Sequence, residues 1–216
     1  AARLVQELIL RCRRALPDHV APAVLAAVCP GLEALARDRN IPWQPAMMLG
    51  EIAGAYWRME AVAALAPRGA HVWGDSGWRN VERNGVQYRG FAGHNRDLGS
   101  IYSASDINLD IGRIYQPDIV TMRVFDVLAC GGFLLAAWSD GLGDLFVLGE
   151  EIETWKTIPE LVEKVDYYLA HPAARERIAA RGRARVLRDH TNRGRIAEML
   201  AHGDLRTASP QRRTEQ

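Results

Sequence analysis

The segment Asp106–Ala137, DINLDIGRIYQPDIVTMRVFDVLACGGFLLAA, contains the order of elements that decides the fold. It predicts a short apolar-rich strand over 106–110, a polar loop over 112–118 and a helix over 119–130 that ends at a pair of glycines. Phe133–Ala137 is apolar throughout, as a strand buried on both faces should be. A strand, a helix and a second buried strand in succession predict a parallel sheet with a right-handed crossover.

The junction between this loop and the predicted helix is the place where the segment could bind a ligand. The first amides of a helix have no internal partners, and the helix dipole adds partial positive charge there, so phosphate binds well. Arg123 lies one turn into the predicted helix and could add a formal charge. Asp118 and Asp126 are eight residues apart and would fall near one face of a continuous helix. This pattern suits a diphosphate flanked by sugars, because carboxylates accept hydrogen bonds from sugar hydroxyls.

The stretch PDIVTMRVFDVLACGGFLLA resembles the donor-binding segment of GT-B glycosyltransferases in the group-1 or family-4-like clan. In that clan two acidic residues separated by seven others precede a Gly-Gly turn into the next strand, and here the pair is Asp118 and Asp126. The branch with the CgeB-like spore maturation proteins is the most similar, because further motifs follow in the same order over about residues 46–200. These motifs are GFxxxxxxLxxxYSxSDINL at 90–109, a DLxxLF-type stretch at 143–146 and YYLAHPxxRxxIAxxGRxRVLRDHT at 167–191.

The resemblance implies the C-terminal, donor-binding half of a glycosyltransferase that transfers a sugar from a nucleotide-diphosphate sugar to an unknown acceptor. It implies that Arg123 and the amides near Ile119, Val120 and Thr121 stabilise the leaving diphosphate. Asp126 would hold ribose hydroxyls and Asp118 the sugar, so Asp118 and Arg123 are the candidate catalytic residues. The other donor-binding candidates follow predicted strands or lie in the polar loop over 112–118. They are Gly74, Trp78, Gly90, Phe91, Arg113 and Tyr115.

Each of these residues also has a simpler interpretation. Asp118 could serve only as a helix N-cap, and Gly74 could belong to an ordinary turn after a strand. Asp126 could form a salt bridge to Arg123 or Arg113, because a buried carboxylate needs a partner. The tryptophans, Trp78 included, are more typical of a core than of a stacking surface.

The chain departs from the clan's common pattern in ways that keep other functions open. Two aspartates stand where glutamates are commoner, and we expect the N-terminal GT-B half to be missing, which would leave donor binding without transfer. The alternatives are a non-catalytic nucleotide-sugar-binding or regulatory module, a nucleotide-sugar epimerase, and a protein-interaction module with a degenerate site.

The composition is that of an ordinary soluble globular protein. The 216 residues carry 27 Lys and Arg against 26 Asp and Glu, so the net charge of +1 favours neither nucleic acid nor an anionic membrane as a partner. Three scattered cysteines predict neither a disulfide framework nor a zinc site, and we expect Cys130 to be buried and inert. The chain has no D-x-D triplet, no membrane-spanning apolar run and no signal peptide, so we predict a cytoplasmic, metal-independent protein without a cofactor.

The predicted fold class is α/β, a Rossmann-like, mostly parallel sheet with helices on both faces. We expect a helical segment over 1–44, the Rossmann-like domain over 45–203 and a disordered tail over 204–216. Thr157 and Glu160 form the pattern of a capping box. The remaining predicted strands are 71–73, 86–89 and 151–155, and the remaining predicted helices are 3–16, 20–38 with a break near residue 29, 45–65, 96–104, 157–170, 172–189 and 192–201.

Overall fold

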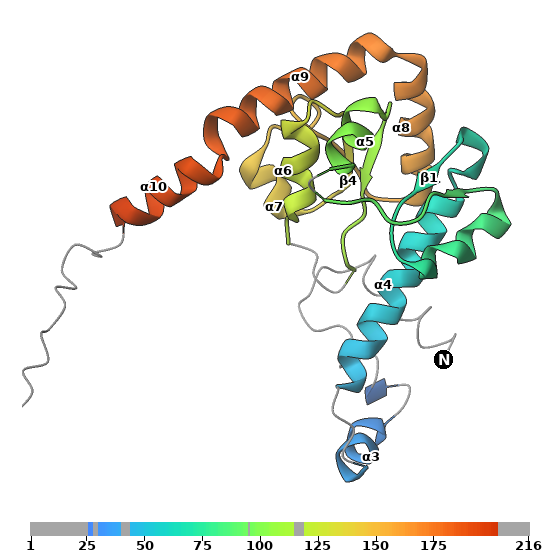
Figure 1. The fold of residues 1–216 in the computed structure, drawn as a ribbon. Coiled ribbons are helices and arrows are strands. Elements are labelled where there is room, and N and C mark those ends of the chain that lie inside the picture. The colour runs from blue at the N-terminus through green and yellow to red at the C-terminus, as the bar shows by residue number, and fades with distance from the viewer. Residues whose placement is uncertain (1–25, 28–29, 40–43, 95, 115–118, 203–216) are drawn as a thin grey trace, which may run out of the picture.

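The computed structural model describes residues 26–27, 30–39, 44–94, 96–114 and 119–202, drawn as coloured ribbon in Figure 1. The main helices are α3 (Leu32–Asp38), α4 (Pro45–Ala63), α5 (Leu98–Ala104), α6 (Met122–Ala129), α7 (Asp140–Leu145), α8 (Ile158–Ala170), α9 (Pro172–Asp189) and α10 (Asn192–His202), with short 3-10 helices η1 (Ala66–Arg68) and η2 (Ser76–Asn84). The strands are β1 (His71–Val72), β2 (Gln87–Tyr88), β3 (Asn108–Asp110), β4 (Leu134–Ala137) and β5 (Glu153–Trp155). The predicted helix 3–16 and the predicted tail 204–216 lie outside the described residues.

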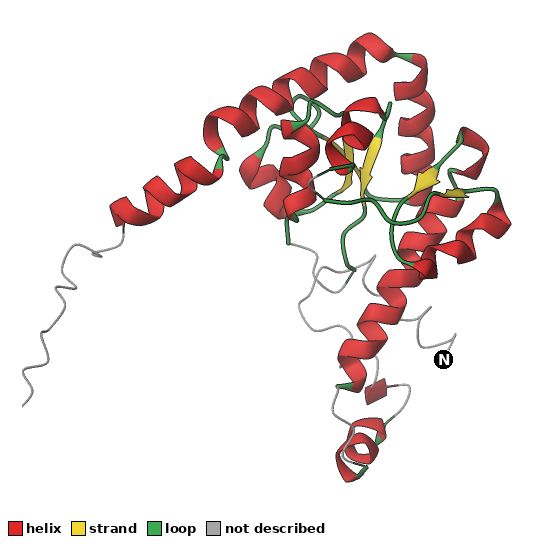
Figure 2. Cartoon of the chain, in the orientation of Figure 1, coloured by secondary structure: helices red, strands yellow, loops and turns green. Residues whose placement is uncertain are grey.

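The strands pair only in parallel within the described part of the chain, in two separate ladders (Figure 2). One ladder joins β1 to β2, and the other has the order β3-β4-β5. The registers pair His71 with Gln87, Asn108 with Leu134 and Leu135 with Glu153. Parallel strands connected by helices confirm the predicted α/β, Rossmann-like class.

The central strand β4 is buried on both faces, as its apolar sequence predicts. Leu134 packs into a cluster with residues of α6 and α7, whereas its neighbour Leu135 packs into a second cluster with residues of α4 and α8. In that second cluster the rings of Trp57 and Trp155 lie 5.6 Å apart. Each fully buried leucine contributes roughly 1.5–3 kcal/mol through the removal of apolar surface from water. The two helical layers therefore cover opposite faces of the sheet, which confirms the predicted arrangement.

Helix α6 begins later than the sequence predicts. It starts at Met122 instead of residue 119, and its N-cap is Thr121, with an extended backbone at φ −80° and ψ 157°. The predicted cap, Asp118, lies outside the described residues and four positions before the helix. The amides of 119–121 therefore precede the helix instead of forming its first turn. The predicted glycine stop is confirmed, since Gly131 follows α6 in the left-handed region at φ 79°.

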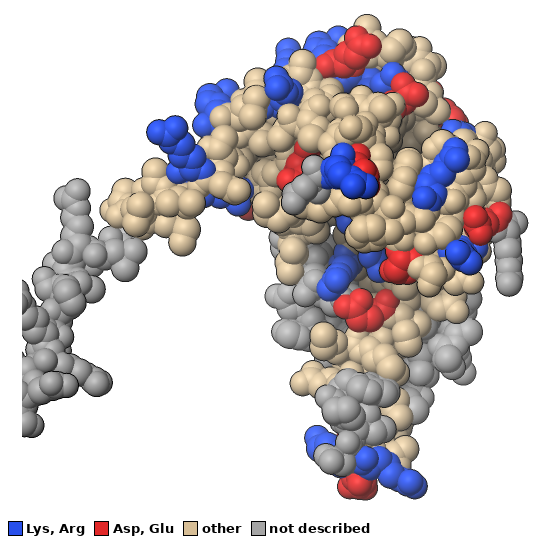
Figure 3. All heavy atoms as spheres, viewed as in Figure 1, with Lys and Arg blue, Asp and Glu red and all other residues tan. Residues whose placement is uncertain are grey.

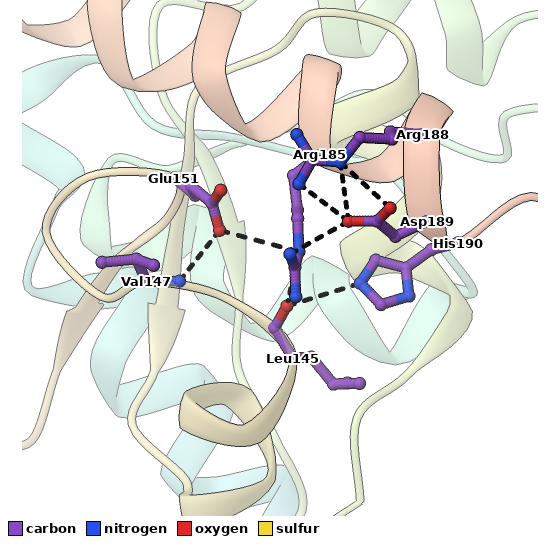
Figure 4. Close-up of polar contacts among 7 residues, drawn as sticks. All are labelled: Leu145, Val147, Glu151, Arg185, Arg188, Asp189 and His190. Atoms are coloured by element: carbon purple, nitrogen blue, oxygen red, sulfur yellow. Dashed lines mark hydrogen bonds and ion pairs between the residues drawn. The ribbon is translucent and has the colours of Figure 1, made fainter.

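The end of α9 is fastened to the loops around β5 by a polar cluster (Figure 4). Arg185 donates from Nε to the carbonyl of Leu145 at 3.1 Å and pairs through Nη1 with Asp189 at 2.9 Å. His190 packs its ring against Phe125 and Phe146, at centroid distances of 5.5 and 5.3 Å. The end of the YYLAHPxxRxxIAxxGRxRVLRDHT motif therefore has a structural role.

The outer surface is unevenly charged although the net charge is small. Basic side chains gather along the outer side of α9 (Figure 3), and several pair with carboxylates, such as Arg181 with Glu150 at 3.0 Å. Helix α10 extends outward from the end of α9 (Figure 1). None of the helices in the described ranges is long and apolar enough to cross a membrane.

Candidate functional site

The carboxyl end of β3 carries a buried acidic side chain, Asp110. Alternation along the strand sends Leu109 into the cluster with α4 and α8, so Asp110 faces the α6 side of the sheet. Its side chain is only 9% exposed, and Arg123 on α6 donates from Nη1 to its Oδ1 at 2.7 Å. The hydroxyl of Thr121 lies 3.4 Å from each carboxylate oxygen. The N-cap residue therefore contacts the strand instead of capping its own helix.

Arg123 connects this buried carboxylate to the surface. Its side chain is 51% exposed, so the guanidinium reaches solvent while one nitrogen is held at Asp110. A guanidinium has five N–H donors, and the bond to Asp110 uses one of them. The sequence left open whether Arg123 binds phosphate or forms a salt bridge to Asp126. Its ion-pair partner among the described residues is instead Asp110.

Tyr102 on α5 completes this group on the helical side of Asp110. Burial raises the pKa of its phenol, with Asp126 adding to the effect and Arg123 opposing it, so both charged groups lie near the ring. Positions 123, 126 and 130 fall on one side of α6, and a Cβ added at Gly99 of α5 would lie 3.8 Å from Cys130 Sγ. That side of α6 therefore faces α5.

The ion pairing of Asp126 and the burial of Cys130 differ from what the sequence suggested. Asp126 is half-buried, and within the described ranges it takes part in no ion pair. The simpler alternative, a salt bridge from Asp126 to Arg123 or Arg113, is therefore absent among the described residues. Cys130 is exposed and not buried, because it occupies the C-cap position where α6 has already ended.

The loops after β1 and β2 form a second group of candidates. The amide of Gly74 donates to the carbonyl of Gly90 at 2.9 Å, which joins the two loops. A Cβ at Gly74 would lie 2.7 Å from Cδ1 of Trp78, so the indole lies against Gly74. Trp78 itself packs against the main core. This packing fits the alternative interpretations of a structural turn and a core tryptophan, and the donor-binding roles of Gly74 and Trp78 stay predictions.

Gly90 and Phe91 are open to solvent. Gly90 adopts φ 80°, a conformation that favours glycine, and a Cβ there would meet nothing within 4 Å. Phe91 is 84% exposed, which is unusual for a phenylalanine. An exposed aromatic ring beside an accessible backbone segment suits contact with a planar ligand group.

Arg113 lies with α4 instead of joining either group. It pairs through Nη1 with Glu51 at 3.3 Å, and both side chains are partly exposed. Tyr115 and Asp118 fall in the segment 115–118, outside the described residues. Ile119 is exposed and Val120 half-buried, and both precede α6. The structure thus brings Arg123, Thr121 and Asp126 together, and joins Gly74, Trp78 and Gly90 separately.

Two residues of the first group were not singled out by the sequence. Asp110 has a signal that could have revealed it, namely a carboxylate at the last position of a buried parallel strand, the edge where α/β folds bind ligands. Tyr102 lies in the YSxSDINL motif, but nothing local indicates that its ring lies near Arg123 and Asp126. Helix packing decides that proximity.

A family model described as glycosyl transferase-like matches residues 56–201. The matched range begins within α4, ends within α10 and contains all the described candidate residues. A search of curated proteins found no match.

Proposed function

The chain belongs to the glycosyl transferase-like family, and we propose that its α/β domain binds a nucleotide-diphosphate sugar whose sugar is transferred to an acceptor. The donor's reacting bond joins the anomeric carbon to a phosphate oxygen. When it breaks, the electron pair stays on the diphosphate, the nucleophilic atom of the acceptor forms the new bond to the anomeric carbon, and the proton that this atom loses passes to a base or to the departing diphosphate. The developing negative charge on the leaving group must be compensated by groups in place before the reaction.

One observation carries this proposal: Arg123 presents a half-exposed guanidinium at the carboxyl end of a parallel strand and in the first turn of α6. Ligands of open α/β folds bind at that edge, and the start of a helix attracts phosphate. Arginine also matches phosphate geometry through paired N–H donors. Arg123 would therefore contact the diphosphate, and the first-turn amides of α6 would add to its charge.

The acidic residues would bind the hydroxyl-rich parts of the donor. Asp126 lies one turn from Arg123, is half-buried and takes part in no ion pair among the described residues, so its carboxylate can accept hydroxyl hydrogen bonds. We propose that it holds ribose hydroxyls, while Asp118 contacts the transferred sugar. Ile119 and Val120 precede the helix, so their amides would act as loop donors.

The nucleotide base would lie against the loop after β2. The open backbone at Gly90 can supply hydrogen-bonding groups, and the exposed ring of Phe91 can stack on a base. Stacking of an aromatic side chain on a base contributes about 1–3 kcal/mol. We also propose Arg113 and Tyr115 as contacts for the sugar.

Calorimetric titration of the chain with UDP, GDP, ADP and their sugar conjugates tests this function. Hydrogen bonds to charged groups contribute about 1.5–3 kcal/mol, so Arg123→Ala should weaken diphosphate binding at least tenfold. Arg181→Ala is the matched control, because Arg181 is 53% exposed and paired with Glu150 but lies on α9. It should bind as the unmodified chain does.

The outcome separates the alternatives. Binding that survives Arg123→Ala, or that Arg181→Ala weakens equally, would place the site elsewhere. Absence of binding by every nucleotide would refute the donor-binding proposal. If a donor binds, product analysis with a labelled nucleotide sugar distinguishes transfer from epimerisation and from binding without turnover.

A further inference from the structure

We infer that Asp110 is a positioning residue that fixes the guanidinium of Arg123 at the edge of the sheet. The inference rests on the proposed function for its ligand but concerns a residue that the ligand need not touch. A carboxylate that is only 9% exposed is costly to keep charged unless it is paired. Its described partners are the Arg123 guanidinium at 2.7 Å and the Thr121 hydroxyl at 3.4 Å.

Asp110 is the ion-pair partner of Arg123 among the described residues, with the Tyr102 phenol also close to the guanidinium. The side chain of Arg123 is 51% exposed, and a long side chain in solvent samples many rotamers that binding would have to restrict. The bond to Asp110 restricts Nη1 before any ligand arrives. The remaining N–H donors of the fork are then available at a fixed place, as recognition of an oxyanion requires.

Both partners stand on regular secondary structure. Asp110 is the last residue of β3, which pairs with β4, and Arg123 lies in the first turn of α6, which packs on the same sheet. Sites held by strands and helices are placed more precisely than sites on loops. The distance between strand end and helix start therefore sets the position of the guanidinium.

A positioning role and a purely electrostatic role of Asp110 predict opposite changes in diphosphate affinity when Asp110 is removed. A carboxylate near an anionic ligand repels it, so removal of the charge alone would tighten diphosphate binding. Loss of a positioning contact would weaken it, because the guanidinium would no longer be held. The sign of the change in affinity for UDP therefore distinguishes the two roles.

The experiment compares UDP binding by the full chain and by Asp110→Ala, Asp110→Asn, Arg123→Ala and the double variant Asp110→Ala with Arg123→Ala. Asp110→Ala should weaken binding about fivefold or more, whereas Asp110→Asn, which keeps an acceptor for Nη1–H, should stay within about twofold. In the Arg123→Ala background, loss of Asp110 should cause no further weakening. Asp106→Ala is the control, because Asp106 precedes β3 and pairs with Arg175 at 2.6 Å, away from Arg123.

A ligand-free measurement makes the result independent of the proposed function. The Nε–Hε signal of Arg123, assigned by its loss in Arg123→Lys, should report an ordered side chain in the unmodified chain and in Asp110→Asn. In Asp110→Ala it should report fast averaging. If Asp110→Ala does not fold, Asp110→Ser keeps a polar group in the site but is too short to hold Nη1, and it serves in its place.

Two results would overturn the inference: tighter or unchanged UDP binding by Asp110→Ala, or an Arg123 signal that stays ordered without the carboxylate. If UDP and the other nucleotides fail to bind the unmodified chain, the proposed function fails, and the Nε–Hε measurement alone decides whether Asp110 positions Arg123. If Arg123→Ala abolishes binding and Asp110→Ala does not weaken it, the proposed function stands and the inference fails.

Discussion

Gly182, in the middle of α9, should tolerate no side chain. Glycine inside a helix is normally unfavourable by about 0.5–1 kcal/mol relative to alanine, so its presence in a buried stretch needs a reason. A Cβ at this position would overlap the carbonyl oxygen of Glu151 and lie 2.8 Å from Cδ2 of Leu128. Because the first of these contacts is with backbone, a side-chain rotation cannot relieve it. Helix α9 would have to move away from α6 and from the turn before β5.

The expected magnitude follows from two opposing effects. Overpacking of a close contact costs roughly 1–3 kcal/mol, and a clash with backbone belongs at the upper end of that range. The higher helix propensity of alanine relative to glycine offsets about 1 kcal/mol of this cost. We therefore expect Gly182→Ala to lower the free energy of unfolding by about 2 kcal/mol and the melting temperature by about 4–8 °C.

Gly143→Ala provides a control with the same change in chemistry. Gly143 lies in α7, where a Cβ would make only an ordinary contact with Leu148 Cδ1 at 4.0 Å. This variant should gain about 0.5–1 kcal/mol. Urea denaturation followed by circular dichroism measures both, and the midpoints should differ by about 1 M. If Gly182→Ala unfolds at the same urea concentration as the unmodified chain, or at a higher one, the close packing of α9 against α6 and the turn before β5 is refuted.

Two further predictions concern polar contacts away from the candidate site. Tyr168→Phe should lower the free energy of unfolding in urea by about 1–2 kcal/mol, because the half-buried carboxylate of Glu153 loses the hydroxyl that donates to it. An unchanged midpoint would mean that Lys164 and the amide of Thr154 satisfy Glu153 without the hydroxyl. The hydrogen bond from Arg188 lowers the pKa of Asp189 below its ordinary value, and Arg185 adds to this. The ionised carboxylate of Asp189 should therefore stabilise the fold above about pH 4, and this stabilisation should be lost as the pH falls further. The difference in unfolding free energy between the unmodified chain and Asp189→Asn should accordingly shrink from pH 6 to pH 2.5. A difference that stays constant over this range would show that the carboxylate is not stabilised by its charge.

The sequence predicted the elements and their class because their signals are local. The apolar run at β4 and the Gly-Gly stop after α6 lie within a few residues of the features that they determine. Thr157 caps α8 by accepting from the amide of Glu160, as the Thr-x-x-Glu pattern predicts. The family likewise followed from motifs in order along the chain, and the match over 56–201 confirms the glycosyltransferase assignment at that level.

The candidate site was predicted less well because its contacts join distant segments. The prediction started α6 at residue 119, since Asp118 is a good N-cap, whereas the structure uses Thr121 and directs its hydroxyl to Asp110. The sequence left open whether Trp78 contacts the donor or belongs to the core, and only packing shows that its indole lies against Gly74. In each case a contact with another part of the chain competed with the local preference.

The sequence by itself determined a parallel α/β domain of the glycosyl transferase-like family, with Arg123 and Asp126 on one helix near its start. Those properties depend on periodicity and order, which residues carry without reference to their neighbours in space. Only the tertiary structure decided that Arg123 is held by Asp110 and that Tyr102 lies near Arg123 and Asp126. The physical reason is that a buried charge takes its partner from whichever element packs against it, and that element is chosen by the packing of the whole domain.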